Sequence, residues 1–313
     1  MTASGVETGP APARVGMLGL GIMGSAMSIN LRAAGFKVVG FDPNSERTHD
    51  FERSGGHPAR SARHVAEQCD VIVSVLPSGD ALGSALLGAQ GVLAAERPGI
   101  VLVESSTLDI DTKLRMARET QRLLTLLDCP ISGTGAQAVQ KDLLVYASGD
   151  RDALRRCEPV IAGYARSCRY AGAFGNGSKM KFVANLLVAI HNVAAAEALV
   201  FGMKAGLDAQ DIYDFIRGGA GGSTMFSVRG PLMVKGDYEP ATMKVQTWQK
   251  DMQIILGFAA ALDCPTPLLS SCAPIYTAAM AQGRGLHDTA SVCAVLEDAA
   301  RLVRPARVTR PDA

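Results

Sequence analysis

The chain has 313 residues, with 31 Lys and Arg against 30 Asp and Glu and a hydrophobic content of 48%. This length suits two domains, and the composition supplies enough apolar side chains for a core in each. The near-neutral charge lacks the basic excess of nucleic-acid-binding and membrane-surface proteins, so we expect neither partner. The seven cysteines include no CxxC pair, and the five histidines show no metal-ligand spacing. We therefore expect a cytoplasmic protein with no disulfide framework and no metal site.

Residues 1–13 contain no apolar stretch, so we expect a disordered leader rather than a signal peptide. From residue 14 onwards, short apolar runs alternate with helical patterns. Strands are predicted at 14–20, 37–42, 70–77 and 100–105, with helices near 25–35, 45–55 and 80–87. This alternation indicates βαβ units and a parallel sheet with helices on both faces. A strand predicted at 143–150 ends this region.

Beyond Gly177 the pattern is helical. A helix predicted from Ser178 to about Ala205 would be roughly 40 Å long, which is enough to bridge two domains. Its apolar stretch contains Asn, His and Glu, which favours a buried helix over a membrane span. Further helices are predicted at 208–217, 242–262, 267–282 and 288–302. We expect a doubly wound Rossmann domain at 14–174, an all-helical substrate and oligomerisation domain at 175–302, and a fraying tail at 303–313.

A glycine-rich turn follows the first predicted strand and opens the first predicted helix. The GxGxxG spacing of Gly19, Gly21 and Gly24 is typical of dinucleotide-binding loops, in which the cofactor pyrophosphate rests on helix N-terminal N–H groups. The cofactor-binding segment predicted here is Gly19, Leu20, Gly21, Ile22, Met23 and Gly24. Asp42 ends the second strand, where a carboxylate binds the adenosine ribose hydroxyls and repels a 2′-phosphate, so NAD is favoured while NADP stays open. The alternative is a glycine turn beside a surface aspartate.

Six separated motifs between about Arg14 and Leu302 resemble the β-hydroxyacid dehydrogenase family, which includes 3-hydroxyisobutyrate dehydrogenases, tartronate semialdehyde reductases and L-threonate dehydrogenases. The motifs are GLGIMGSAM at 19–27, Val75-Leu76-Pro77, Glu104-Ser-Ser-Thr107, DCPISGTG at 128–135, GNGSKMKFVAN at 175–185 and Lys250-Asp251-Met252. The resemblance implies that Leu76, Pro77 and Thr107 line the cofactor and that Ser132, Gly133 and Thr134 bind substrate. Thr134, Lys141 and Ala184 depart from the family pattern, all in the substrate region.

Hydride transfer between an alcohol and nicotinamide needs a group that gives or takes the hydroxyl proton. Lys179 and Lys181 compete for this role and, being two residues apart on a helix, point to different faces. Lys181 has Asn185 at i+4, where an amide can hold the ammonium or a substrate hydroxyl. The family motif also selects Lys181, so we predict Lys181 as the general acid/base and Asn185 as a substrate ligand.

Two further residues are candidates in the helical domain. Lys250 would reach the cofactor or the substrate carboxylate, or would be a surface lysine beside Asp251. Ser223, in the segment GAGGSTMF, is a candidate for lining the substrate site.

The sequence thus predicts an NAD(P)-dependent oxidoreductase that interconverts a small 3-hydroxy acid and its 3-oxo form. We expect it to assemble as a homodimer or homotetramer through the apolar helices beyond Gly177. The alternatives are an imine-reductase-like enzyme and a non-catalytic dinucleotide-binding module. Both are disfavoured by the presence of Lys181.

Overall fold

The computed structural model describes residues 14–304. The predicted leader at 1–13 and residues 305–313 of the predicted tail lie outside the described residues. The chain divides into two compact units, one ending at Ala184 and the other beginning at Asn185. This division falls inside one long helix. The boundary predicted between residues 174 and 175 precedes that helix and stays a prediction.

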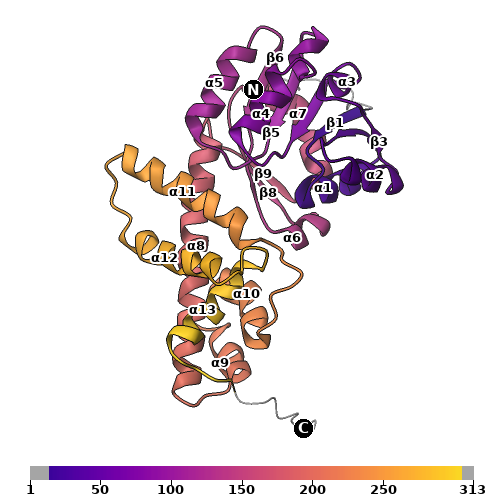
Figure 1. Ribbon diagram of the computed structural model, residues 1–313. Helices are drawn as coiled ribbons and strands as arrows, with labels where there is room; N and C mark the ends of the chain where they lie inside the picture. Colours follow the sequence, from indigo (N-terminus) through magenta and orange to yellow (C-terminus); the bar gives the residue numbers. More distant parts are fainter. Residues whose placement is uncertain (1–13, 305–313) are drawn as a thin grey trace, which may run out of the picture. The chain divides into compact units, whose positions relative to one another are not determined.

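The first unit is built on a six-stranded parallel sheet with the strand order β3-β2-β1-β4-β5-β6. Figure 1 shows this sheet with its surrounding helices. Its strands are β1 (Arg14–Leu18), β2 (Lys37–Phe41), β3 (His57–Pro58), β4 (Val71–Ser74), β5 (Ile100–Glu104) and β6 (Leu124–Asp128). The helices between them are α1 (Ile22–Ala33), α2 (Ser45–Arg53), α3 (Ala62–Ala66), α4 (Gly79–Leu87), the 3₁₀ turn η1 (Val92–Ala95) and α5 (Ile110–Thr120). The strand order is that of a doubly wound dinucleotide-binding fold, which confirms the predicted Rossmann sheet.

Both faces of this sheet are buried, which explains why its strands are continuous apolar runs. Successive residues of a strand point to opposite faces. Val15 and Met17 of β1 therefore pack in a core with α1, whereas Leu18 packs in a second core beneath α3 and α4.

The predicted strand at 143–150 is shorter in the structure and does not join the large sheet. It forms β8 (Leu144–Ala147), the central strand of a three-stranded sheet between β7 (Ile131–Ser132) and β9 (Ser167–Tyr170). Two helices accompany this small sheet, α6 (Gly135–Val139) and α7 (Arg151–Tyr164). Val145 and Ala147 share a core with β1 and α7, so the two sheets belong to one unit.

The second unit is helical, as predicted. Its helices are the later part of α8 (Asn176–Lys204), followed by α9 (Ala209–Ile216), α10 (Thr224–Lys235), α11 (Val245–Ala261), α12 (Pro267–Ala281), the 3₁₀ turn η2 (Thr289–Ser291) and α13 (Val292–Ala299). Helix α10 has no counterpart among the predicted helices, because Gly230 and Pro231 interrupt its helical pattern.

A buried ion pair explains why α11 and α13 begin later than predicted. The carboxylate of Asp288 pairs with Arg229 and accepts hydrogen bonds from the Thr242 N–H at 2.9 Å and the Ala290 N–H at 2.9 Å. These contacts fix the chain at 242 and 288 outside the α-helices. Burial opposes ionisation of Asp288, but Arg229 and these donors outweigh it, so its pKa lies below the ordinary value.

Helix α8 is long and apolar enough to cross a membrane by length and composition alone. Core helices of soluble proteins can have the same length and composition. The helix carries buried polar groups that are bonded within the helical unit. The Asn192 amide donates to the Tyr276 hydroxyl at 2.9 Å and to the Thr289 carbonyl at 3.0 Å. These bonds fit the predicted core helix.

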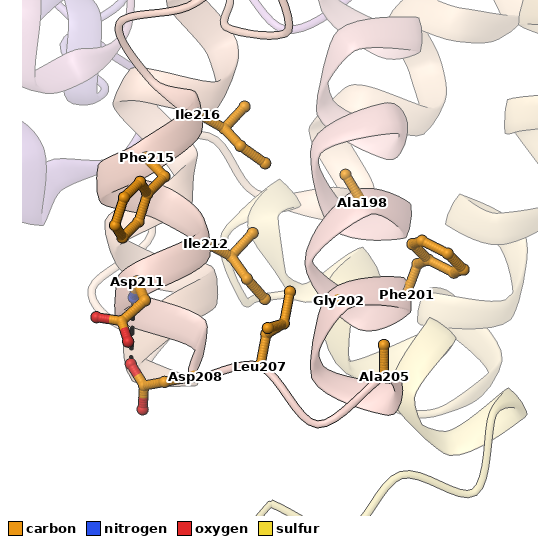
Figure 2. A pocket seen from close by; sticks show the side chains of 10 residues that line it. All are labelled: Ala198, Phe201, Gly202, Ala205, Leu207, Asp208, Asp211, Ile212, Phe215 and Ile216. Carbon is orange, nitrogen blue, oxygen red and sulfur yellow. Dashed lines mark hydrogen bonds between the residues drawn. The ribbon is translucent and has the colours of Figure 1, made fainter.

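An apolar pocket of about 550 Å³ opens between the end of α8 and α9. Figure 2 shows Leu207 and Ile212 between the two helices, with Phe201 on α8 and Phe215 on α9 to either side. Phe201 is 77% exposed and Phe215 is 85% exposed. Large aromatic side chains left in water at this level mark a surface that another molecule can cover.

Candidate active site

The glycine loop has the geometry that a dinucleotide needs. Gly19 has a φ of +89°, and a Cβ on Gly24 would lie 1.9 Å from the Gly19 carbonyl oxygen, so α1 can start this close to β1 only without side chains. Gly21 caps α1 without a side-chain hydrogen bond, and the first turn of the helix carries no acidic residue. The positive end of α1 therefore suits the pyrophosphate of a dinucleotide.

Asp42 lies directly after β2 and is bonded to this loop. Its carboxylate accepts hydrogen bonds from the Leu20 N–H at 2.8 Å and the Asn44 N–H at 2.9 Å, and only 6% of the residue is exposed. The Arg47 guanidinium lies 3.4 Å from the same carboxylate. The acidic group is thus fixed beside the glycine loop, as the sequence predicts, with a cation next to it.

The other predicted cofactor residues of this unit follow β4 and β5. Strand register pairs Leu18 with Ser74, and Ser74 with Glu104, so the carboxyl ends of β1, β4 and β5 meet at one edge of the sheet. The Leu76 N–H donates to the Ser106 hydroxyl at 2.7 Å, which ties the turn after β4 to the segment containing Thr107. Ligands of open parallel sheets bind at this edge.

The predicted substrate loop joins β7 to α6. Ser132 ends β7 and Gly133 follows it, while Thr134 is the N-cap of α6 in a capping box with Gln137. The Thr134 N–H donates to the Gln137 side chain at 3.0 Å, and the Gln137 N–H donates to the Thr134 hydroxyl at 3.4 Å. The departure from the family pattern at Thr134 thus has a structural role in starting α6.

Lys141, the second departure, has a φ of +58°. This is the left-handed region that glycine adopts without strain, which accounts for the glycine common at this position in the family. The third departure, Ala184, is half-buried on α8 and has no structural explanation here.

The two competing lysines on α8 differ in environment. Lys179 is exposed, and its ammonium lies 3.3 Å from the Asn176 side-chain oxygen. Lys181 is buried, with only 8% of the residue exposed. A buried lysine is costly and is commonly kept for chemistry, so this difference favours Lys181.

Three polar residues of the helical unit lie together. The Asn185 amide donates to Asp251 at 3.3 Å, and the Lys250 ammonium lies 3.2 Å from the other oxygen of the same carboxylate. Asp251 therefore links two predicted site residues. Ser223 is the N-cap of α10, where its hydroxyl accepts a hydrogen bond from the Phe226 N–H at 3.0 Å.

A buried ionic cluster at the same edge of the large sheet escaped sequence analysis. It consists of Glu104, Lys113 and Asp128, each fully buried, and is called the carboxylate–lysine cluster below. The Lys113 ammonium lies 2.5 Å from Glu104 and 2.9 Å from Asp128. Burial by itself lowers the pKa of Lys113, but the two carboxylates outweigh it and raise the pKa above its usual range. Burial likewise opposes ionisation of Asp128, while Lys113 and Ser178 hold its pKa below the ordinary value.

The sequence does contain a signal for this cluster. Lys113 lies three residues from both Ile110 and Met116, which places a lysine on the inward face of α5. Since Met116 is fully buried, a charged residue on this face needs buried partners. Helix α5 has no counterpart among the predicted helices, so its inward face is seen only in the structure.

Two known protein families match successive parts of the chain. Residues 14–172 match the family described as the NAD binding domain of 6-phosphogluconate dehydrogenase. Residues 175–296 match the family described as NAD-binding of NADP-dependent 3-hydroxyisobutyrate dehydrogenase.

The relatives that align with most of the chain include dehydrogenases of hydroxy acids. An L-threonate dehydrogenase of Cupriavidus necator is 33% identical over 280 residues, covering 89% of this chain and 94% of the relative. A probable 3-hydroxyisobutyrate dehydrogenase of Mycobacterium tuberculosis is 33% identical, covering 84% of this chain and 90% of the relative. A solved 3-hydroxyisobutyrate dehydrogenase from Salmonella typhimurium superposes with a TM-score of 0.82 at 31% identity, covering 90% of this chain and 99% of that one. An imine reductase from Pseudomonas sp. reaches 20% identity and a TM-score of 0.54, which is a likeness of fold alone.

The fold and the two family matches define an NAD(P)-dependent oxidoreductase. The chain belongs to the β-hydroxyacid dehydrogenase family, whose members act on the CH–OH group of hydroxy acids. The predicted family, enzyme class and use of an NAD(P) cofactor are confirmed.

Proposed function

We propose that the protein interconverts a small 3-hydroxy acid and its 3-oxo form, with Lys181 as the general acid/base. The observation that carries this proposal is the burial of Lys181, one helical turn from Asn185, while Lys179 is exposed. The relatives that bear the names L-threonate dehydrogenase and 3-hydroxyisobutyrate dehydrogenase support this class of substrate.

When bound, the nicotinamide cofactor accepts or supplies the hydride. In the oxidation direction, the Lys181 amine takes the proton of the substrate hydroxyl as the C–H bond breaks. In reduction, the Lys181 ammonium returns a proton to the alkoxide oxygen. Asn185, held by Asp251 at 3.3 Å, is placed to orient the reacting oxygen or the lysine.

The substrate carboxylate is assigned to the loop after β7. Thr134 has its N–H and its hydroxyl engaged with Gln137, so Ser132 and Gly133 are the direct ligands and Thr134 shapes the loop. Ser223 and Lys250 are further candidates from the helical unit, Ser223 for substrate and Lys250 for cofactor.

The adenosine ribose is assigned to Asp42 and the nicotinamide side of the cofactor to Leu76, Pro77 and Thr107. Since the Asp42 carboxylate is fixed beside the glycine loop, NAD is proposed as the preferred cofactor.

We also propose a homodimer or homotetramer that works in the cytoplasm. The exposed Phe201 and Phe215 beside the pocket of the helical unit support self-association. The seven cysteines are all free, which suits a reducing compartment.

Cofactor reduction followed at 340 nm, with a panel of hydroxy acids, tests the activity. The panel contains 3-hydroxyisobutyrate, L-threonate, glycerate and L-serine, with 2-hydroxybutyrate as the control in which the hydroxyl lies on the other carbon. Turnover of at least one 3-hydroxy acid with little turnover of the control is expected. Reduction of a cyclic imine by NADPH, without turnover of any hydroxy acid, would refute the proposal.

A further inference from the structure

The carboxylate–lysine cluster is bonded to the start of the helix that carries Lys181. The first N–H groups of a helix have no acceptor within the helix. In α8 the Ser178 N–H donates to Asp128 at 2.8 Å, and the Ser178 hydroxyl donates to the other oxygen of Asp128 at 2.7 Å. The Gly177 N–H donates to the Ser148 hydroxyl at 2.9 Å, which itself donates to Asp128 at 2.9 Å. The first turn of α8 is therefore bonded to one buried carboxylate.

Close contact of the backbones reinforces this attachment. A Cβ added at Gly177 would lie 2.3 Å from the Tyr146 carbonyl oxygen and 2.7 Å from the Asp128 carbonyl oxygen. The helix can start this near β6 only because residue 177 is glycine. The negative carboxylate of Asp128 also faces the N-terminus of α8, which is the positive end of the helix dipole.

The same cluster is bonded to the segment assigned to the cofactor. The Lys113 ammonium donates to the Ser106 carbonyl at 2.8 Å, and the Ser106 N–H donates to Glu104 at 2.9 Å. The Ser106 hydroxyl accepts the Leu76 N–H at 2.7 Å. One buried cation thus connects the turns after β4 and β5 to the first turn of α8.

A contribution to folding stability does not by itself explain why three charged residues are buried together. Removing three charged groups from water is expensive, and well-packed apolar residues in place of a buried ion pair are often as stable. Strand register places Glu104 directly beside Asp128, two like charges that require the cation between them. What the cluster does supply is fixed geometry, because each group has several directional partners.

We propose that Glu104, Lys113 and Asp128 are positioning residues, which hold the turn of α8 that leads to Lys181 in register with the cofactor-binding edge of the sheet. This inference rests on the proposed role of Lys181 in catalysis. Lys181 lies three residues after Ser178, so it moves with the turn that Asp128 holds. A displacement of about 1 Å at a catalytic group lowers turnover by up to about 100-fold.

Ser178→Ala in the full-length protein tests the inference, since it removes one hydroxyl contact and leaves the three charges paired. Thr120→Val is the matched control, because Thr120 is also buried but its hydroxyl donates, among the described residues, to the Met116 carbonyl alone, at 2.8 Å within α5. Hydrogen exchange of the α8 amides, kcat, KM and the Kd for NAD are measured for both variants well below their Tm.

We expect Ser178→Ala to accelerate exchange in the first turns of α8 by about 10-fold or more, with exchange in α1 unchanged. Its kcat should fall about 10-fold, while KM and the Kd for NAD stay within about twofold, because only the catalytic group moves. Thr120→Val should change neither exchange in α8 nor kcat.

A kcat for Ser178→Ala equal to that of Thr120→Val would overturn the positioning role, and unchanged exchange in α8 would overturn the attachment itself. If the unmodified protein turned over no hydroxy acid, the proposed function would fail, while the exchange measurement would still decide whether the cluster anchors the helix.

Discussion

At the scale of single residues, the two lysines at the start of α8 provide a direct test of the chemistry. Lys181→Ala should lower kcat by about 100-fold or more, which is the usual contribution of general acid–base catalysis. Affinity for NAD should change little, because the glycine loop and Asp42 are untouched. Steady-state kinetics on an active hydroxy acid, with cofactor binding measured separately, provide the comparison.

Lys179→Ala is the matched control, since Lys179 is exposed on another face of the same helix. We expect its kcat to lie within about twofold of the unmodified protein, as is usual for a surface substitution. The assignment is wrong if Lys179→Ala abolishes turnover and Lys181→Ala retains it.

Asp42 and Arg47 should have opposite effects on the preference for NAD over NADP. A buried carboxylate at this position repels a 2′-phosphate, whereas the guanidinium 3.4 Å away would attract one. Because Asp42 is fixed by two backbone N–H groups, we expect kcat/KM to favour NAD over NADP. Asp42→Ala should reduce this preference by about 10-fold or more, and Arg47→Ala should leave it in place. If the protein prefers NADP and this preference disappears in Arg47→Ala, then Arg47 rather than Asp42 determines the choice of cofactor.

At this scale, the sequence predicts best those positions at which the backbone requires one residue type. The structure places the glycine loop at the start of α1 and Asp42 after β2, as their spacing in a strand–turn–helix motif predicts. Lys113 was missed because its partners, Glu104 and Asp128, come from two other elements of the chain. The contact between them exists only after β5 and β6 have paired, which spacing along the chain does not reveal.

At the scale of elements, the close packing of α1 on β1 depends on Gly24. A methyl group there would lie 1.9 Å from the Gly19 carbonyl oxygen, so Gly24→Ala must displace the loop or the helix. We expect the Kd for NAD to rise by about 10-fold or more, since the N–H groups at the start of α1 move away from the pyrophosphate. Isothermal titration with NAD measures this effect.

Gly83→Ala is the matched control for that substitution. Gly83 also lies within a helix, α4, but a Cβ there would meet no atom of the described residues 14–304 within 4 Å. Alanine should stabilise α4 by about 0.5–1 kcal/mol and leave NAD binding unchanged. Equal NAD affinity in both variants would contradict the role of the glycine loop.

The elements that sequence predicted best are those with an uninterrupted pattern. The long helix was predicted from Ser178 to about Ala205 and runs over Asn176–Lys204, because its apolar residues continue without proline. Helix α10 was missed because Pro231 lies inside it, and the start of α11 was predicted early because Asp288 binds the chain at Thr242. Proline and tertiary hydrogen bonds both override local helical preference.

At the scale of the whole molecule, each unit contains a buried aspartate whose pKa is lowered, Asp128 in the first and Asp288 in the second. Burial opposes their ionisation, but Lys113 and Arg229 outweigh it. In the unfolded chain an aspartate titrates near pH 4, so on acidification the unfolded state binds protons before the folded state does. The contribution of ionised Asp128 and Asp288 to the free energy of unfolding is therefore complete above about pH 5. It is lost as the pH falls further.

We expect the Tm to drop by at least about 5 °C between pH 5 and pH 3. Asp288→Asn should have a lower Tm at pH 7 and a weaker dependence on acid, because one of the two groups no longer titrates. Thermal unfolding followed by circular dichroism measures both, and a Tm that is constant down to pH 3 would contradict the role of these groups.

The exposed aromatic residues of the helical unit lead to a prediction about assembly. Phe201 and Phe215 beside the pocket between α8 and α9 are 77% and 85% exposed, and burying such side chains contributes about 1.5–3 kcal/mol each. A second copy of the chain can cover them without any other component. Phe215→Asp should therefore shift the protein towards the monomer in sedimentation velocity at micromolar concentration, because a carboxylate would have to be buried unpaired in the interface.

Leu262→Asp is the matched control, since Leu262 is 60% exposed in the same unit but does not line the pocket. If the unmodified protein sediments as a monomer, or if both variants dissociate equally, this surface is not where the copies meet.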